Sequence, residues 1–310
     1  MMKTRKILFT IFAVLGIVST FALTSCESDD DNKMEDQKNI VEVAVANPNF
    51  SILVSALQKT ELVSVLEGQG PFTVFAPTNA AFNQLFSDLG IDGINDLTKE
   101  QLTPILLYHV VGSKVKSTDL TNRYVTTLST GPSNKNVSLK VDATNLKLNG
   151  SSGITSADIG ATNGVIHVID RVLLPPTVVD IALSNPNFSI LVSALVKAEL
   201  VETLKGNGPF TVFAPTDDAF NALFAALEVS GIADLSKEAL TPILLDHVVS
   251  GNVQSTDLTS GSVKTLNNTI NINVSSGVKI NTDIYVTLAD VQGTNGVVHV
   301  IDKVIVTATK

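Results

Sequence analysis

The 310-residue chain contains no tryptophan and only one cysteine, and aromatic residues make up only 5% of it. With a single cysteine, no intramolecular disulfide can stabilise the fold. Positive charge is also scarce, because 21 basic residues stand against 30 acidic ones. An acidic chain repels phosphate groups, which argues against nucleic acid as a partner and against electrostatic binding to anionic lipid.

Apolar residues are plentiful, at 44% of the chain, and its length fits two domains of ordinary size. The segment Gly-Pro-Phe-Thr-Val-Phe-Ala-Pro-Thr occurs without change at 70–78 and again, 138 positions later, at 208–216. The segment 163–170 recurs at 295–302, displaced by 132 positions and with valine in place of Ile166. A period this long indicates tandem domains and not a solenoid. We therefore predict domains at 39–176 and 177–310, joined at Leu174-Pro175-Pro176-Thr177.

The repeated segment predicts a buried strand with abrupt ends, because two prolines bracket the apolar run from Phe72 to Phe75. Thr78 follows the run, and its hydroxyl can accept a backbone N–H of a helix that begins there. Apolar residues then recur at i, i+3, i+4 and i+7 from Phe82 to Leu89, which predicts one apolar helix face.

A second helix is indicated by Thr98 and Gln101, which have the spacing of a capping box. Pro104 is expected to break or restart that helix. Beyond it the apolar period changes to two, as at 137–141, which is typical of half-buried strands. The segment 164–174 is apolar on both faces and predicts a central strand. Helices followed by strands predict an α+β domain.

The first 25 residues carry three basic side chains and no acidic one, and an apolar run extends from Ile7 to Leu23. Leu23-Thr24-Ser25-Cys26 resembles the lipobox of bacterial lipoproteins, in which the cysteine becomes the lipidated N-terminus. A plain signal peptide and an N-terminal anchor helix are the alternatives. We predict a lipoprotein signal peptide at 1–25, whose removal leaves 18 basic and 30 acidic residues and a net charge of −12.

Residues 26–38 are predicted to be an acidic tether that begins with Cys26-Glu27-Ser28-Asp29-Asp30-Asp31-Asn32. Their charges repel one another and favour a solvated, extended segment. The run also resembles the acidic signal that sends lipoproteins of some Gram-negative bacteria to the outer face of the outer membrane. We therefore expect a membrane anchor at Cys26 in the outer membrane, with a periplasmic and a surface-exposed position both open.

Three ordered motifs, each found twice, resemble the fasciclin-type domain family. The first motif matches 73–82 and 211–220, the Tyr-His pair matches Tyr108-His109, and the last matches 163–174 and 295–306. The second repeat departs from the family at the pair, where it has Asp246-His247. The resemblance covers both repeats, and it implies a seven-stranded β-wedge with a cluster of helices in each. It also implies extracellular adhesion or binding, and not catalysis.

In animal members of that family, the Tyr-His region and a motif centred on Asp-Ile are implicated in integrin binding. The resemblance places these candidate binding residues at Tyr108, His109, Asp158 and Ile159. We carry over their position on the surface, and not the partner. Because Asp246 replaces the tyrosine in the second repeat, we expect the first domain to carry more of the affinity, unless the Asp246 site meets a basic partner.

All four histidines lie at repeated positions, His109 with His247 and His167 with His299. One interpretation is a metal or proton-transfer site, and the other is a set of core residues satisfied by hydrogen bonds. The second is favoured, because no HExxH motif, Cys/His pairing or acidic ligand loop accompanies them. We therefore predict no metal and no cofactor.

The sequence thus predicts a lipid-anchored, cell-surface or periplasmic adhesion or binding protein that is not an enzyme and whose partner is a surface protein or a glycan. The alternative is a carrier or accessory lipoprotein that binds a small apolar or glycan ligand. A large concave apolar pocket within one repeat would favour the carrier. A flat face rimmed by Tyr108 and Asp158 would favour adhesion.

The predicted anchor is tested by Cys26→Ala, which should leave an unlipidated precursor because the lipidated thiol is gone. Mature wild-type protein should partition into the detergent phase of a detergent extraction, since each buried methylene of a lipid chain contributes about 0.8 kcal/mol. Wild-type protein that stays wholly in the aqueous phase would show that Cys26 carries no lipid.

Overall fold

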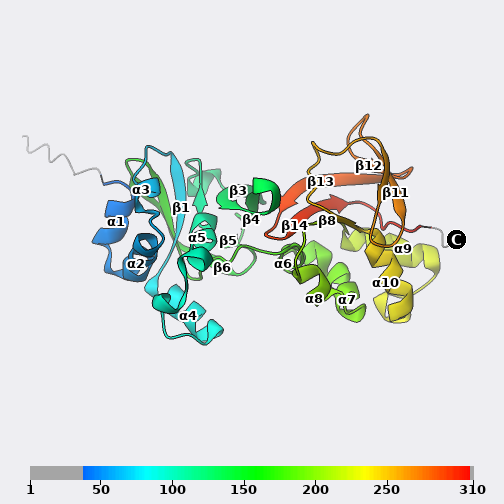
Figure 1. The fold of residues 1–310 in the computed structure, drawn as a ribbon, viewed down its shortest axis with the longest axis horizontal. Helices are drawn as coiled ribbons and strands as arrows, with labels where there is room; N and C mark the ends of the chain where they lie inside the picture. Colours follow the sequence, from blue (N-terminus) through cyan, green and yellow to red (C-terminus); the bar gives the residue numbers. More distant parts are fainter. Residues whose placement is uncertain (1–37, 308–310) are drawn as a thin grey trace, which may run out of the picture. The chain divides into compact units, whose positions relative to one another are not determined.

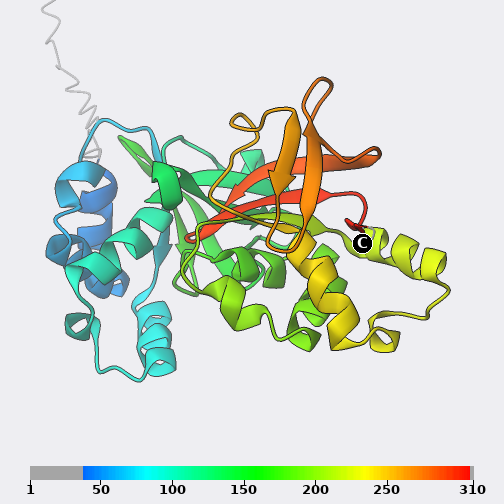
Figure 2. The same cartoon turned by 45° about the vertical axis from the view of Figure 1, so that its right-hand side comes forward.

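The computed structural model describes residues 38–307. In each repeat the helices gather on one side of two central parallel strands (Figures 1 and 2). Both repeats belong to a single compact unit. The helices of the first repeat are α1 (Ile40–Ala46), α2 (Ser51–Lys59), α3 (Val63–Leu66), α4 (Asn79–Leu89) and α5 (Lys99–Tyr108). Those of the second are α6 (Val178–Leu183), α7 (Ser189–Lys197), α8 (Val201–Lys205), α9 (Asp217–Leu227) and α10 (Lys237–Asp246).

Seven strands make up the sheet of each repeat, which confirms the expected α+β class. In the first repeat they close into a barrel, in chain order: β1 (Phe72–Pro77), β2 (Val110–Val111), β3 (Arg123–Thr130), β4 (Asn136–Asp142), β5 (Lys147–Leu148), β6 (Ser152–Ala161) and β7 (Gly164–Ile169). In the second repeat the sheet has the order β10-β11-β12-β13-β14-β8-β9. Its strands are β8 (Phe210–Pro215), β9 (Val248–Ser250), β10 (Gly261–Lys264), β11 (Thr269–Asn273), β12 (Lys279–Ile280), β13 (Ile284–Gln292) and β14 (Gly296–Ile301).

Strands β1 and β7 run parallel and separate two hydrophobic cores. Val74 and Ile166 face the helices and belong to the core beneath them. Phe75 and Ile169 face the other way, into the barrel interior. This arrangement explains why both strands are apolar on both faces, as the sequence predicts for central strands.

Two predicted caps are confirmed, and one predicted break is wrong. Thr78 accepts the Ala81 N–H at the start of α4, and Thr98 and Gln101 form a complete capping box on α5. Helix α5, however, continues through Pro104. A proline here removes only the hydrogen bond to the carbonyl of Glu100, which lies on the exposed first turn and can bind water.

Two other expectations need correction. Leu89, predicted on the apolar face of α4, is 50% exposed, because the helix ends there and the chain turns away at Gly90 with φ of 66°. The central strand predicted over 164–174 ends at Ile169. The chain beyond it leaves the sheet, although Leu173 remains buried in the barrel core.

The two repeats contact each other through buried polar groups. The Gln292 N–H donates to the Ser138 hydroxyl at 3.0 Å, and the Asn252 side chain donates to the Pro132 carbonyl at 3.2 Å. The backbones also approach closely, since a Cβ placed on Gly131 would lie 2.4 Å from the Gly293 carbonyl oxygen. The contact therefore limits the relative motion of the repeats, in keeping with the short joint between them.

The joint is itself attached to the second repeat. The Pro176 carbonyl accepts the Thr294 N–H at 2.8 Å, and the Thr177 side chain caps α6. The predicted domain boundaries at 39–176 and 177–310 remain predictions, and the residues expected to form the signal peptide, Cys26 and the tether lie outside the described part of the chain. Within 38–307, no single helix is long and apolar enough to cross a membrane, and only the bent pair Ile40–Ala46 and Pro48–Lys59 meets that test jointly.

We expect the fragments 38–175 and 177–310 each to unfold cooperatively, because each contains its own cores, and each to be less stable than in the intact chain. Ser138→Ala should cost the intact chain about 1–3 kcal/mol, because it leaves the Gln292 N–H buried without an acceptor. The same substitution in the isolated first fragment is the control, since the Gln292 partner is absent there. Urea unfolding that shows equal losses in fragment and intact chain would contradict the contact between the repeats.

Candidate functional site

Tyr108 ends helix α5 and is fully buried in the barrel core. Its hydroxyl donates to the Ser138 carbonyl and accepts from the Asn149 side chain, both at 2.9 Å. Burial raises the pKa of the phenol, so it stays protonated and keeps both bonds at neutral pH. The expected surface position of Tyr108 is therefore wrong, because the wide apolar ring is more stable inside the barrel.

The second repeat has a buried residue at the same place. Asp246 is 2% exposed, and its carboxylate accepts hydrogen bonds from Asn267 and from the hydroxyls of Thr265 and Thr307. Neither side chain can touch a partner in this conformation. The expected difference in affinity between the repeats therefore has no basis in this pair.

His109 is 2% exposed, which also corrects its expected surface position. Its Nδ1–H donates to the Ile105 carbonyl at 2.8 Å, and its Nε2 accepts the Leu173 N–H at 2.9 Å. The ring is therefore a neutral imidazole that links α5 to the segment after β7. His247 makes the same link to Ile243 and Ile305 in the second repeat.

The other two histidines also bridge backbone groups. The Nε2–H of His167 donates to the Val115 carbonyl at 2.9 Å, and its Nδ1 accepts the Asp158 N–H at 3.3 Å. The His167 ring stacks on Phe75 with a centroid separation of 5.5 Å. His299 has equivalent partners, so the structural interpretation of the histidines holds in both repeats. Among residues 38–307, no three His, Cys, Asp or Glu side chains are grouped to hold a metal ion.

Asp158 is exposed, as expected, but its carboxylate is already bonded within the protein. It accepts the Ser117 N–H at 2.8 Å and the Ser117 hydroxyl. These two bonds hold the pKa of Asp158 below its usual value. Its φ of 62° lies in the left-handed region, and Asp290 of the second repeat repeats both the φ and the bonds to a serine. Asp158 thus fixes a loop onto β6.

Ile159 is half-buried against the core beneath the helices, so it offers only part of its side chain to a partner. The four candidate binding residues therefore belong to separate internal networks and do not form one exposed face. A face rimmed by Tyr108 and Asp158, which was expected to favour adhesion, is not present in the described structure.

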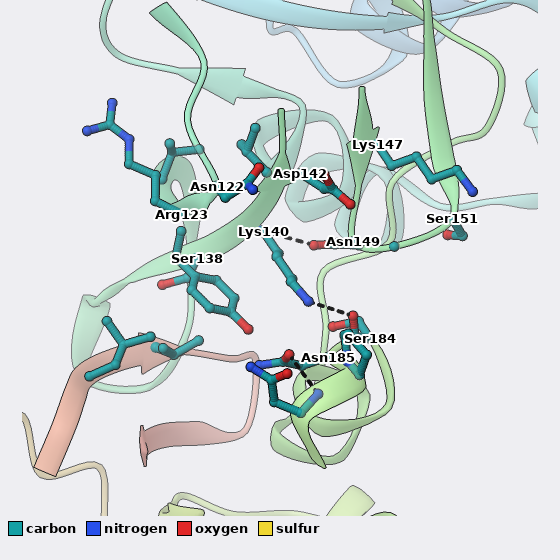
Figure 3. A pocket seen from close by; sticks show the side chains of 18 of the residues that line it. Asn122, Arg123, Ser138, Lys140, Asp142, Lys147, Asn149, Ser151, Ser184 and Asn185 are labelled. Carbon is teal, nitrogen blue, oxygen red and sulfur yellow. Dashed lines mark hydrogen bonds between the residues drawn. The ribbon is translucent and has the colours of Figure 1, made fainter. Parts of the chain in front are cut away.

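The structure reveals instead a cleft between the repeats, with a volume of about 1200 Å³ (Figure 3). One wall is the outer face of β3, β4 and β5, where Tyr124, Lys140 and Lys147 lie. The other wall includes Ser184 and Asn185, which follow α6, and part of β13. The Lys140 ammonium crosses the cleft and donates to the Ser184 carbonyl at 3.0 Å.

Tyr108 supports this cleft from inside the barrel. Its hydroxyl binds the Ser138 carbonyl and Asn149, and Asn149 in turn accepts the Lys140 N–H at 3.1 Å. Ser138 and Lys140 are the β4 residues that bond to the second repeat. The tyrosine of the Tyr-His motif thus fixes the strand that forms the cleft wall.

Sequence reasoning missed the cleft because its residues come from distant segments. A signal was nevertheless present, since Lys140 lies at an outward position between the inward-facing Leu139 and Val141. In the first repeat Tyr124 of β3 pairs with Lys140 of β4, and the equivalent pair in the second repeat is Ser262 of β10 with Asn271 of β11. The cleft-forming face is therefore specific to the first repeat, and comparing outward positions between the copies would have shown the difference.

The sequence pattern of the Fasciclin domain matches this chain twice, at residues 48–175 and 186–307. Protein sll1483 of Synechocystis sp. is 36% identical over 184 residues, which cover 56% of this chain and 99% of that protein. The transforming growth factor-beta-induced protein ig-h3 of Sus scrofa is 29% identical, covering 78% of this chain and 35% of that protein. Human periostin is also 29% identical, covering 80% and 30%. The chain therefore spans about a third of these two animal relatives.

Among solved structures, a domain pair from the insect cell adhesion molecule fasciclin I aligns with this chain. Its TM-score is 0.47 and its sequence identity is 21%, with 86% of this chain and 96% of that chain covered.

Desolvation lowers the pKa of His109 and of His247 to about 4, from an ordinary value of 6.5. As the pH falls, the two histidines of the unfolded chain take up protons before those of the folded chain do. The stability that the neutral, buried histidines contribute is therefore complete above about pH 6.5 and is lost as the pH falls toward 4. We expect a loss on the order of a few kcal/mol across this window. Urea unfolding at pH 7 and pH 5 measures it.

His109→Gln should lower stability at pH 7 and reduce the loss between pH 7 and pH 5, since one titrating group is removed. Aspartates with lowered pKa values, such as Asp158, change the stability only at lower pH, because the ordinary pKa of an aspartate is 3.8. A variant with the full wild-type pH dependence would show that His109 does not titrate as its burial requires.

Proposed function

Because the chain belongs to the fasciclin domain family, we propose that it is an adhesion or binding protein of the cell surface or periplasm, held on the membrane by a lipidated Cys26. The family membership of both repeats supports a binding role, and fasciclin I is named as a cell adhesion molecule. The observation that carries the proposal is the open cleft of about 1200 Å³ between the repeats, whose lining mixes polar and apolar surface. It gives the tandem pair a concave surface that neither repeat has alone.

A carrier of a small apolar ligand is less well supported. The enclosed apolar spaces beneath the helices, near Leu195 in one repeat and Leu57 in the other, hold only about 20 Å³ each. A space of that size accommodates about one water molecule, and not a ligand. A glycan ligand remains compatible with the cleft.

Binding is favoured over catalysis by the state of the side chains that could do chemistry. Both ring nitrogens of His109 and His167 are bonded to backbone groups, and the Asp158 carboxylate is bonded to Ser117. A general acid or base needs a proton-exchanging atom within reach of a substrate, and the buried, fully bonded rings of His109 and His167 offer none.

The soluble mature chain, residues 27–310, tests the binding role directly. Fluorescently labelled protein should be retained on intact bacterial or host cells in a saturable way, and excess unlabelled protein should compete, because a defined site fills. An unrelated acidic protein of similar size and charge is the control. Retention no greater than that of the control, or without saturation, would contradict the proposal.

A further inference from the structure

Positive charge gathers at the cleft of a chain that is otherwise acidic. Three basic residues, Arg123, Lys140 and Lys147, line the cleft, against two acidic ones. Arg123 and Lys147 are exposed and Lys140 is half-buried. In the view of Figure 3, Arg123 and Lys147 lie on either side of Lys140. A local excess of cations in an acidic protein favours an anionic ligand at this place.

The two acidic residues of the cleft are bonded within the protein. Both oxygens of Asp142 accept hydrogen bonds from Asn145, at 3.0 Å from its backbone and at 2.8 Å from its side chain. Both oxygens of Asp290 accept from Ser255. These hydrogen bonds orient both carboxylates and leave them charged, while Arg123, Lys140 and Lys147 make no salt bridge among residues 38–307.

Further donors of the cleft are available to a ligand. The Lys140 ammonium gives one bond to Ser184 and has two protons left. The Tyr124 hydroxyl also has no hydrogen-bond partner among the described residues, but it is buried and does not reach a ligand in this conformation. Burial raises the pKa of the Tyr124 phenol to about 12, so the hydroxyl stays protonated at neutral pH. The nearby Asn185 side chain lowers this pKa slightly, although it is not within hydrogen-bond geometry of the hydroxyl. The cleft thus supplies cationic donors at its surface, with the Tyr124 hydroxyl beneath them.

We propose that this cleft binds an anionic oligosaccharide, a chain that carries uronate or sulfate groups, with Arg123, Lys140 and Lys147 pairing with its charges. The inference rests on the proposed function and names the class of ligand. Guanidinium and ammonium groups bind carboxylates and sulfates through charge-assisted hydrogen bonds. Sugar hydroxyls can bond to the amide and hydroxyl side chains of the lining, and the half-buried Tyr124 ring offers an apolar edge beside them.

The size and lining of the cleft favour a glycan over other anions. A volume of about 1200 Å³ exceeds that of usual drug-sized pockets, which suits several linked sugars. The lining is rich in amide and hydroxyl side chains, which suit a ligand with many hydroxyl groups. These are Asn122, Thr126, Thr144, Asn149, Ser151 and Asn187. Asn122, Thr144 and Asn149 already bond within the protein, whereas an acidic peptide or an anionic lipid headgroup would leave the side chains of Thr126, Ser151 and Asn187 unmatched.

Isothermal titration of residues 27–310 with three hexasaccharides of matched length tests the proposal. The probes are a hexauronate, a heparin-derived sulfated hexasaccharide and the neutral cellohexaose. At least one anionic probe should bind at one site per chain, and cellohexaose should bind at least tenfold more weakly. The two anionic arms identify which charged group is preferred. Affinity should fall as salt is raised, because the pairing is electrostatic.

Arg123→Gln combined with Lys147→Gln should weaken binding at least tenfold. Both residues are exposed, so the fold should be retained, and thermal melting checks this. The matched control is Lys116→Gln with Lys264→Gln, which removes the same charge at exposed positions outside the cleft and should leave affinity unchanged.

Several results would overturn the proposal. These are absence of binding to both anionic probes, equal weakening by the cleft and control variants, or equal binding of a poly-glutamate peptide or of anionic lipid vesicles. Retention on cells without oligosaccharide binding would remove this inference and leave the proposed function standing. Oligosaccharide binding without retention on cells would contradict the proposed function and leave this inference standing.

Discussion

The parallel pairing of β1 with β7, and of β8 with β14, is the constraint on which the rest of each repeat depends. The two strands pair in register over six positions in each copy. Because they are buried on both faces, they hold the helices on one side and the remaining strands on the other. Phe75 and His167, which stack on each other, fill the barrel side, while Val74 and Ile166 fill the helix side. A polar substitution at either face would therefore disturb a core that no loop rearrangement can replace.

Local signals predicted much of this fold. Prolines and apolar residues located β1, Thr78 located the start of α4, and alternation over 137–141 located β4. These features depend on residues close in the sequence. The burial of Tyr108 was not predictable in the same way, because it depends on the closing of β3 and β4 over the end of α5. The cleft likewise depends on segments more than 40 positions apart, such as Lys140 and Ser184.

The interface between the repeats is not built from repeated residues. Gln292 of the second repeat bonds to Ser138 of the first. The residue of the first repeat that is equivalent to Gln292, by its pairing with the last strand, is Gly160. In the opposite direction, Lys140 aligns with Asn271. Each copy therefore carries only one half of the contact. The two repeats therefore differ where they meet, whereas the cores beneath their helices keep the same three phenylalanines, Phe50, Phe82 and Phe86 in one and Phe188, Phe220 and Phe224 in the other.

The position of Tyr108 bears on how loss-of-binding variants of such proteins are interpreted. A substitution there would let β4 shift, since the Ser138 carbonyl and Asn149 lose their common partner. The cleft would then change shape although the altered residue never meets the ligand. An alanine scan would score this buried side chain as an epitope, and only a stability measurement on the same variants would separate a residue that holds the wall from one that touches what binds there.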